Sequence, residues 1–149
     1  MQPGTDYIGI ATSFYCIDEN NYLAFHYRTQ ACRDEHKRWD TGSGQLDFGL
    51  TPEENALREI EEEYGCKGEI IGSVPPHSII REQGGRTTHW LAVPFFVRVR
   101  RADVVLRESE KHTDLRWETL ASLPSPLHTG FAYTLERYRD HFERYVRKA

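Results

Sequence analysis

With 149 residues, the chain is long enough for one domain that buries about two thirds of the surface of its unfolded form. A composition of 38% hydrophobic, 28% charged and 12% aromatic residues excludes a disordered chain. The net charge of −4 gives no general attraction to nucleic acid or to an anionic membrane, so a polyanionic ligand requires a local basic patch or a metal ion.

The cysteines and the apolar segments indicate the compartment. Cys16, Cys32 and Cys66 form no CxxC pair and leave an odd number, which favours free thiols in a reducing environment. No apolar run is long enough to span a membrane, and no signal-peptide pattern opens the chain. We therefore expect a cytoplasmic protein without a membrane or nucleic-acid partner.

The first elements predicted along the chain are strands. Residues 7–17 are apolar and aromatic, and the pattern resumes at residues 22–28 after an Asp-Glu-Asn-Asn turn, which predicts a β-hairpin. The polar segment 29–40 predicts a loop. Four basic side chains are grouped in or next to it: Arg28, Arg33, Lys37 and Arg38. This loop is either a solvated surface segment or a basic guide for a polyphosphate chain, in which case Arg28 and Arg38 are candidates for substrate binding.

The segment 42–65 predicts a loop, a short strand, a second loop and a helix. Thr51 is a suitable N-cap, Pro52 suits the first helical position, and Glu54 completes a capping box. Gly65 ends the helix. Apolar residues at helical spacing give the helix a side that faces a core: Ala56, Leu57, Ile60 and Tyr64.

Three carboxylates share one face of this helix, because Glu59, Glu62 and Glu63 are three and four residues apart. Arg58 stands beside them. Carboxylates at this spacing repel one another by roughly a few tenths of a kcal/mol per pair. A divalent cation removes this repulsion, since Mg²⁺ and Mn²⁺ prefer oxygen ligands and bridge to phosphate. From spacing alone, the alternative is a solvated acidic face.

Strands are predicted again after the helix. Two extended pieces within residues 67–82 are separated by two prolines, and a tight turn follows at residues 83–86. Residues 87–99 form the most hydrophobic stretch and predict a central strand, in which Pro94 requires a bulge or an edge position. In this strand His89 and Trp90 either face a pocket, where they could contact a base, or pack in the core.

The last part of the chain predicts a charged connection over residues 100–112, a short strand over 114–117 and a helical turn over 118–123. Apolar residues at steps of four and three then predict one amphipathic helix packed on the sheet: Phe131, Leu135, Tyr138, Phe142 and Tyr145. Strands first, an acidic helix in the middle and a helix at the end favour a mixed sheet between helices.

Residues 44–66 resemble the Nudix box, Gly-x5-Glu-x7-Arg-Glu-U-x-Glu-Glu-x-Gly-U, where U is a bulky apolar residue. Cys66 stands at the last apolar position, and Leu50 occupies the position of the first glutamate. The other fixed positions match: Gly44, Arg58, Glu59, Ile60, Glu62, Glu63 and Gly65. The resemblance implies an α/β class Nudix fold, which is an α/β/α sandwich with a mixed central sheet, and a single Nudix hydrolase domain over residues 1–149.

The resemblance also implies a Nudix-type pyrophosphohydrolase, in which water attacks a phosphorus of a diphosphate linkage with the help of Mg²⁺ or Mn²⁺. Glu59, Glu62, Glu63 and the carbonyl of Gly44 are the implied metal ligands, and Glu62 is either a third ligand or the general base. Arg58 completes the catalytic group by orienting the glutamates.

Leu50 is the one departure that bears on catalysis, because the glutamate of the family at this position commonly pairs with the arginine of the box. We expect Asp47 or Glu62 to pair with Arg58 instead, and metal affinity to be weakened or altered. The departure also leaves open a catalytically weakened nucleotide-binding or sensor module on the same fold.

The substrate class rests on weaker signals. Residues 110–117 and the following Leu-Pro resemble the tail of the MutT-like nucleoside triphosphate pyrophosphohydrolases. Glu108 and Glu110 fall in the loop where that family often supplies an extra acidic group, and an exposed loop carboxylate is the alternative for each. The proline of ADP-ribose hydrolases is replaced by Ile80, and the tyrosine of diadenosine polyphosphate hydrolases is missing. We expect a nucleoside triphosphate, intact or damaged, with a nucleotide sugar as the alternative. The resemblance leaves a homodimer open.

Overall fold

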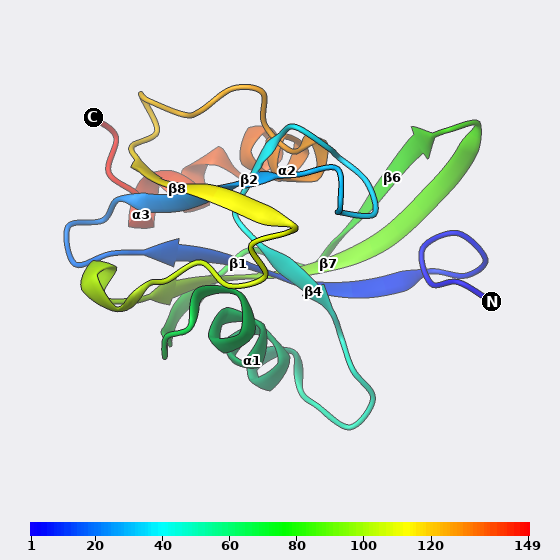
Figure 1. Cartoon of the computed structure of the whole chain (residues 1–149), viewed down its shortest axis with the longest axis horizontal. Coiled ribbons are helices and arrows are strands. Elements are labelled where there is room, and N and C mark those ends of the chain that lie inside the picture. Colours follow the sequence, from blue (N-terminus) through cyan, green and yellow to red (C-terminus); the bar gives the residue numbers. More distant parts are fainter.

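The computed structural model describes all residues from 1 to 149 and shows one sheet between two helical layers (Figure 1). Helix α1 (Pro52–Tyr64) covers one face, and helices α2 (Thr129–Arg137) and α3 (Arg139–Tyr145) cover the other. This is the α/β/α sandwich that the Nudix box implied. None of the three helices is long and apolar enough to cross a membrane.

The sheet is mixed. Strands β1 and β7 run parallel from the pair Gly9–Trp90 to the pair Ile17–Arg98, and every other pairing is antiparallel. A short 3₁₀ helix, η1 (Arg101–Asp103), precedes the last strand. The eight strands are β1 (Gly9–Ile17), β2 (Leu23–Arg28), β3 (Trp39–Asp40), β4 (Ser43–Gln45), β5 (Glu69–Ser73), β6 (His77–Gln83), β7 (Arg86–Arg98) and β8 (His112–Glu118).

Strand β7 is central, as its hydrophobicity predicted, with β1 on one side and both β5 and β6 on the other. Pro94 lies where β5 has ended and β6 has not begun, and its carbonyl accepts a hydrogen bond from the Val74 amide at 3.2 Å. The carbonyl and nitrogen of a strand residue point to the same side, so the missing N–H of Pro94 faces this interruption. The expected local edge is therefore present.

The predicted hairpin exists only at its closed end. Strands β1 and β2 pair at Ile17–Leu23, after which β2 turns away and pairs with β3 and β8. Strand β4 pairs instead with the first half of β1, so the chain crosses from β2 to β1 between β3 and β4. The result is a fork in the sheet, and the cavity described below lies in it.

Helix α1 begins and ends where the sequence indicated. The Thr51 hydroxyl accepts from the Glu54 amide at 3.1 Å, and the Glu54 carboxylate accepts from the Thr51 amide at 3.0 Å, which completes the capping box. Such a cap stabilises a helix by about 1 kcal/mol. Gly65 ends the helix in the left-handed region with φ of 62°. Ala56, Ile60 and Tyr64 are fully buried against the sheet.

The C-terminal part corrects two expectations. The single amphipathic helix is two helices, because the backbone leaves helical geometry at Tyr138 (φ −121°, ψ 35°). The apolar spacing still identified the buried face, since the five apolar side chains all pack in one core with β1, β2 and β7. Residues 119–122 form a turn and not a helical turn, and β8 extends to Glu118, beyond the predicted strand.

Candidate functional site

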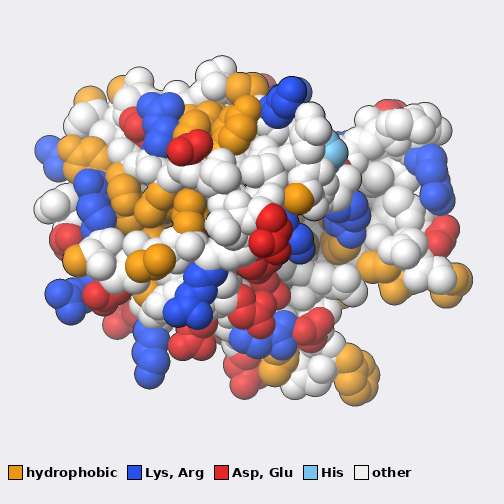
Figure 2. Space-filling view, in the orientation of Figure 1, with side chains coloured by type: hydrophobic (Ala, Val, Ile, Leu, Met, Phe, Trp, Pro, Cys, Tyr) orange, Lys and Arg blue, Asp and Glu red, His pale blue; other side chains and the backbone are white.

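A cavity of about 590 Å³ opens in the fork of the sheet. Ligand pockets typically measure roughly 300 to 1,000 Å³, so a nucleotide-sized molecule fits. We define its acidic wall as Asp40, Glu59, Glu63 and Glu108, and its aromatic wall as Tyr15, Trp90 and Phe131. In Figure 2, acidic side chains gather over α1 and next to the centre of the molecule, with basic side chains between them.

The three glutamates that share one face of α1, which we call the acidic stripe, do not lie in equivalent places. Glu63 and Glu59 line the cavity, with side chains that are 5% and 16% exposed. The Glu62 side chain is 53% exposed, does not line the cavity and lies beside Arg58, 3.6 Å from its Nε. The stripe predicted from spacing therefore divides into two glutamates inside the cavity and one at its rim.

Gly44 brings the backbone of β4 against Glu59. A Cβ atom at position 44 would lie 2.2 Å from Cδ of Glu59, so only glycine permits this approach. The carbonyl of Gly44, which pairs with Thr12 in the sheet, also accepts a long hydrogen bond, 3.4 Å, from the Thr12 hydroxyl. This carbonyl and the Glu59 carboxylate are thus oxygen donors that belong to the same corner of the cavity.

Arg58 has the partners that the sequence proposed in place of the missing glutamate. It forms an ion pair with Asp47 and lies 3.6 Å from a carboxylate oxygen of both Glu59 and Glu62. Leu50 is half-buried in the loop before the helix, and its amide donates to the Asp47 carbonyl at 3.2 Å. The tight turn that contains Leu50 therefore presents Asp47 to the arginine.

Asn55 holds this arrangement together, and sequence reasoning gave it no role. Its buried side-chain amide donates to the Thr12 hydroxyl at 2.8 Å and to the Gln45 carbonyl at 3.1 Å. Its oxygen accepts from the Asp47 amide and from Arg58, both at 3.2 Å. In the sequence, the only indication of this role was that Asn55 lies on the same helix face as Arg58. Asparagines on a polar helix face are commonly solvated.

The acidic wall carries charge that the protein does not fully compensate. Burial, and then the nearby carboxylates of Glu59 and Asp40, raises the pKa of Glu63 well above its usual value. Burial and the charge of Glu62 also raise the pKa of Glu59. The Oε2 atom of Glu63 is buried without a hydrogen-bond partner, which costs about 1 to 3 kcal/mol or more. Oxygen donors in this state fit a hard divalent cation.

The two basic candidates for substrate binding both contact other groups of the protein. Arg28 lines the cavity, but its guanidinium is occupied by Asp34 at 3.1 Å and by Asp40 at 3.3 Å. These contacts hold the long loop after β2 against the sheet. Arg38 lies outside this cavity, where it donates to the Leu127 carbonyl at 3.1 Å. The basic loop is therefore ordered by internal ion pairs.

Two other candidates lie next to the residues that line the cavity. His89 bonds the Ser78 hydroxyl at 2.9 Å and does not line the cavity, whereas Trp90 does. Successive residues of a strand point to opposite faces, and the sequence left open which of the two faced inward. Glu110 is exposed and also outside the cavity, whereas Glu108 lines it.

The aromatic wall is built on close backbone contacts. The Trp90 ring lies on Gly4 and Gly9, where a Cβ atom would approach ring atoms to 2.3 and 2.5 Å. The Arg33 guanidinium carbon is 5.0 Å from the centroid of the same ring. Tyr15 and Phe131 contact each other edge to face, with ring centroids 5.8 Å apart. Tyr15 and Phe131 are almost fully buried, so Trp90 and the exposed Arg33 are the groups of this wall that a ligand can reach.

Glu35 connects the loop after β2 to the far side of the cavity. Its carboxylate accepts from the Thr129 amide and hydroxyl at 2.7 and 2.8 Å and from Gln83 at 2.8 Å. It also forms an ion pair with Arg81 at 3.2 Å, and its side chain is only 6% exposed. One loop carboxylate thus joins the N-terminus of α2 to β6, a long-range contact that no local pattern indicated.

Comparison with known proteins agrees with this geometry. A family model described as NUDIX domain matches residues 9–138. A MutT NUDIX hydrolase from Burkholderia pseudomallei is similar in structure (TM-score 0.76, 23% identity), with 89% of this chain and 99% of that chain covered. A MutT protein from Methanosarcina mazei Go1 is also similar (TM-score 0.71, 21% identity, 92% and 94% covered). So is a UDP-X diphosphatase (TM-score 0.66, 19% identity, 94% and 68% covered). At these identities the structural likeness supports the fold alone. Because the family model spans most of the sequence, the chain belongs to the NUDIX family, and it is a Nudix-type pyrophosphohydrolase.

Proposed function

We propose that the chain hydrolyses a nucleoside triphosphate, intact or oxidised, to the monophosphate and pyrophosphate with the help of Mg²⁺ or Mn²⁺. One observation carries the proposal: the two glutamates inside the cavity share it with the aromatic wall. A cation held by the glutamates would bind the phosphate chain, and Trp90 would stack on the base. Base stacking on an aromatic side chain contributes about 1 to 3 kcal/mol.

Glu59, Glu63 and the carbonyl of Gly44 are the proposed metal ligands. Nudix hydrolases generally use divalent cations. When bound, such an ion neutralises the charge that builds on phosphate oxygens and lowers the pKa of a bound water. The unpartnered oxygen of Glu63 and the glycine contact with Glu59 support this ligand set. Arg58 contacts the carboxylates of both Glu59 and Glu62 and orients them.

Glu62 has two proposed roles that an experiment can separate. Its half-exposed carboxylate lies at the rim, where it is either a third metal ligand or the base that accepts a proton from the attacking water. In Glu62→Gln, a lower kcat at unchanged metal affinity identifies the base. A higher metal requirement, with kcat restored at saturating metal, identifies the ligand.

The alternative substrate is a nucleotide sugar, which the likeness to a UDP-X diphosphatase favours. Such a substrate has the same diphosphate linkage, with a sugar in place of the terminal phosphate. The Leu50 departure favours a different outcome, a weakened enzyme that mainly senses a nucleotide. Asp47 and Glu62 both contact Arg58, which argues for turnover.

A nucleotide panel tests these proposals. The purified chain is incubated with nucleoside triphosphates, oxidised guanine nucleotides and UDP-sugars, each with Mg²⁺, Mn²⁺ or EDTA, and products are separated by ion-exchange chromatography. We expect monophosphate and pyrophosphate from a triphosphate, and no product with EDTA. Preferred cleavage of UDP-sugars would establish the alternative substrate, and tight binding without product would establish a sensor.

The matched variants are Glu63→Gln and Glu61→Gln. Glu63→Gln should lower turnover by about 100-fold or more, because residues that merely orient a metal ligand already contribute roughly 10- to 100-fold. Glu61 is on the same helix, exposed and outside the cavity, so Glu61→Gln should turn over as the original chain does. Equal activity of the two variants would rule out Glu63 as a ligand.

We also propose that residues 1–149 act as one Nudix domain in the cytoplasm. The three cysteines are free and buried, which suits a reducing compartment. Sedimentation velocity of the full chain tests whether it forms a homodimer.

A further inference from the structure

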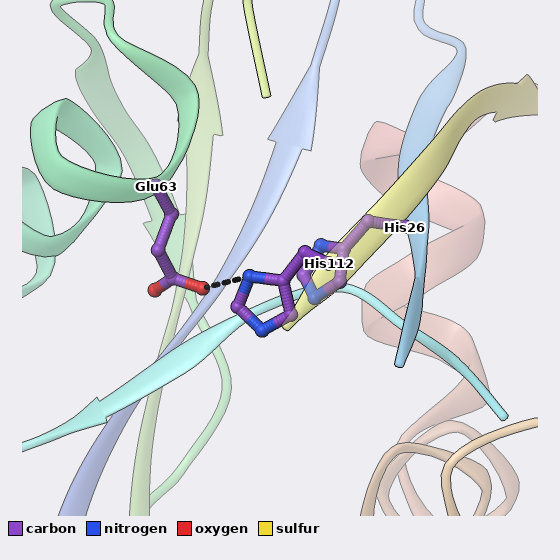
Figure 3. Close-up of side chains that lie close together, drawn as sticks. All are labelled: His26, Glu63 and His112. Carbon is purple, nitrogen blue, oxygen red and sulfur yellow. Dashed lines mark ion pairs between the residues drawn. The ribbon is translucent and has the colours of Figure 1, made fainter. Parts of the chain in front are cut away.

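Three buried polar side chains from three different elements meet beside the acidic wall (Figure 3). His26 comes from β2, His112 is the first residue of β8, and Glu63 comes from the last turn of α1. One potential ligand atom from each lies within 4.8 Å of the others. Nδ1 of His112 is 3.6 Å from Oε1 of Glu63, and the two imidazole rings have centroids 4.2 Å apart.

Each of these side chains has a buried atom without a hydrogen-bond partner: Nε2 of His26, Nδ1 of His112 and Oε2 of Glu63. Buried polar atoms are nearly always hydrogen-bonded, so three unpartnered atoms in one cluster require an explanation. A ligand that accepts lone pairs from all three at once supplies it. The protein itself offers no such explanation, because none of its groups forms a hydrogen bond with these three atoms.

The hydrogen bonds around His26 leave a lone pair on its unpartnered nitrogen. With the Tyr64 hydroxyl donating to the Thr41 carbonyl at 3.4 Å, its oxygen can accept from Nδ1–H of His26 at 2.7 Å. Nε2 is then unprotonated. Metal-binding histidines are fixed in this way, through a hydrogen bond from the other ring nitrogen.

An irregularity of the sheet aims the two rings at each other. The pairing of β2 with β8 shifts by one residue between His26 and Tyr27, next to the pair formed by Arg28 and His112. Bulges of this kind redirect side chains and occur frequently beside functional sites. The shift brings two histidines from neighbouring strands toward the end of α1.

We propose that His26, His112 and Glu63 bind one divalent transition-metal ion, such as Zn²⁺, on the imidazole side of Glu63. Imidazole suits Zn²⁺ and related ions, whereas Mg²⁺ prefers oxygen, so this site differs in its ligand chemistry from the proposed magnesium site, with which it shares Glu63. Metal–nitrogen bonds of about 2.1 Å place tetrahedral ligands roughly 3.4 Å apart, which small side-chain rotations achieve here. The bound ion connects α1 to β2 and β8 and fixes the orientation of Glu63. This metal site can exist whether or not the chain catalyses the proposed hydrolysis.

Cobalt(II) is the probe, because its visible absorption distinguishes four- or five-coordinate sites with nitrogen ligands from hydrated or all-oxygen six-coordinate sites. The metal-free full chain is titrated with CoCl₂ in the presence of saturating Mg²⁺, and ZnCl₂ is then added. We expect one equivalent of Co²⁺ to produce intense visible bands that Mg²⁺ does not suppress and Zn²⁺ removes. Octahedral-type weak bands, or no binding, would overturn the proposal.

His26→Asn is the critical variant, since an asparagine amide can still donate to Tyr64 but lacks the Nε2 ligand. It and His112→Gln should lose the bands, while His141→Asn, on α3, controls for incidental binding by histidine. Tyr64→Phe keeps all three ligands and should weaken binding by about 10- to 100-fold. Circular dichroism confirms that each variant is folded.

Glu59→Gln separates this proposal from the proposed function. It removes a cavity ligand outside the cluster, so it should impair Mg²⁺-dependent turnover and keep the Co²⁺ bands. If instead Glu59→Gln abolishes the bands while folded His26→Asn and His112→Gln retain them, the ion occupies only the carboxylate site and the histidine site does not exist. If no substrate turns over at all, the absorption titration still decides the question.

Discussion

The acidic wall and the aromatic wall of the cavity are held in place in different ways. Glu59 and Glu63 project from one helix that is capped at both ends, and Gly44 packs directly on Glu59. The aromatic wall is assembled from β1, β7 and α2, and the loop beside it is held by the contacts of Glu35. The metal-binding side is thus fixed by local structure, whereas the substrate side depends on long-range contacts. Changes in the first should lower kcat, and changes in the second should raise KM.

Gly44→Ala should have the largest effect of the variants that keep every cavity carboxylate. The added Cβ would lie 2.2 Å from Cδ of Glu59 and must displace that carboxylate. A displacement of about 1 Å in a reacting site can lower the rate by roughly 100-fold, so kcat should fall by about that factor with little change in KM. Steady-state kinetics at saturating Mg²⁺ measures both.

A second substitution tests the physical reason for that effect. Glu59→Asp shortens the side chain by one methylene, which removes the atom nearest the added Cβ and leaves Cγ, 2.5 Å away, as the remaining conflict. The double variant Gly44→Ala with Glu59→Asp should therefore lose less activity than the sum of the two single effects in free energy predicts. Strict additivity would show that the glycine acts elsewhere, for example through the β4 backbone.

Trp90→Ala tests the aromatic wall. Loss of one stacking surface costs about 1 to 3 kcal/mol, which corresponds to a rise of KM by roughly 5- to 150-fold while kcat changes less. Thr87→Ala, at an exposed position of the same strand, is the control. A fall in kcat at constant KM would indicate that Trp90 supports the acidic wall and does not contact the base.

Glu35→Gln tests the loop contact and has a defined pH dependence. Burial opposes the ionised form, but hydrogen bonds from Thr129 and the charges of His128 and Arg81 lower the pKa of Glu35 below its usual 4.5. A folded-state pKa below the unfolded one gives stability above the unfolded pKa that is lost as pH falls through the folded value. The variant should thus be less stable at pH 7, by about 1 to 3 kcal/mol, and the difference should shrink below about pH 4.5.

Urea denaturation at pH 7 and at pH 4 measures this difference, and Glu82→Gln, an exposed carboxylate of β6, is the control. KM should rise a few-fold in Glu35→Gln because the loop that carries Arg33 is no longer anchored. A stability difference that stays constant with pH would mean that the ionised carboxylate is not what holds the loop.

These comparisons also explain which features the sequence could indicate. The caps, the acidic stripe and the buried side of α1 depend on residues within one or two turns of one another, so spacing alone located them. The choice between His89 and Trp90 depends on which face of β7 meets the cavity, and the fork between β1 and β2 decides that. Local patterns contain no information about such a fork.

Long-range polar contacts were missed for the same reason. Glu35 and Thr129 are separated by most of the chain, and His26 and His112 are brought together by a bulge in the pairing of β2 with β8. The basic loop was correctly located, but Arg28 is occupied by Asp34 and Asp40, whose positions depend on the folded loop. Sequence reasoning identified the groups that could act, and tertiary structure determined which of them face the cavity.

Leu50→Glu should have the smallest effect of these variants. It restores the glutamate of the Nudix box, so the change in Mg²⁺ affinity measures how much affinity the chain loses by having leucine there. In the present structure Arg58 is already in contact with Asp47, and that pair is partly exposed, so a new glutamate competes for an occupied partner. Exposed ion pairs contribute about 0 to 1 kcal/mol, which corresponds to at most roughly a five-fold change in Mg²⁺ affinity.

Isothermal titration with Mg²⁺, in Leu50→Glu with and without Asp47→Ala, separates the contributions of Asp47 and of the new glutamate. If Asp47 replaces the missing glutamate, Asp47→Ala should weaken Mg²⁺ binding in the original chain and have little effect once Glu is present at position 50. An equal effect in both backgrounds would mean that Asp47 acts independently, and that the absence of the glutamate is uncompensated.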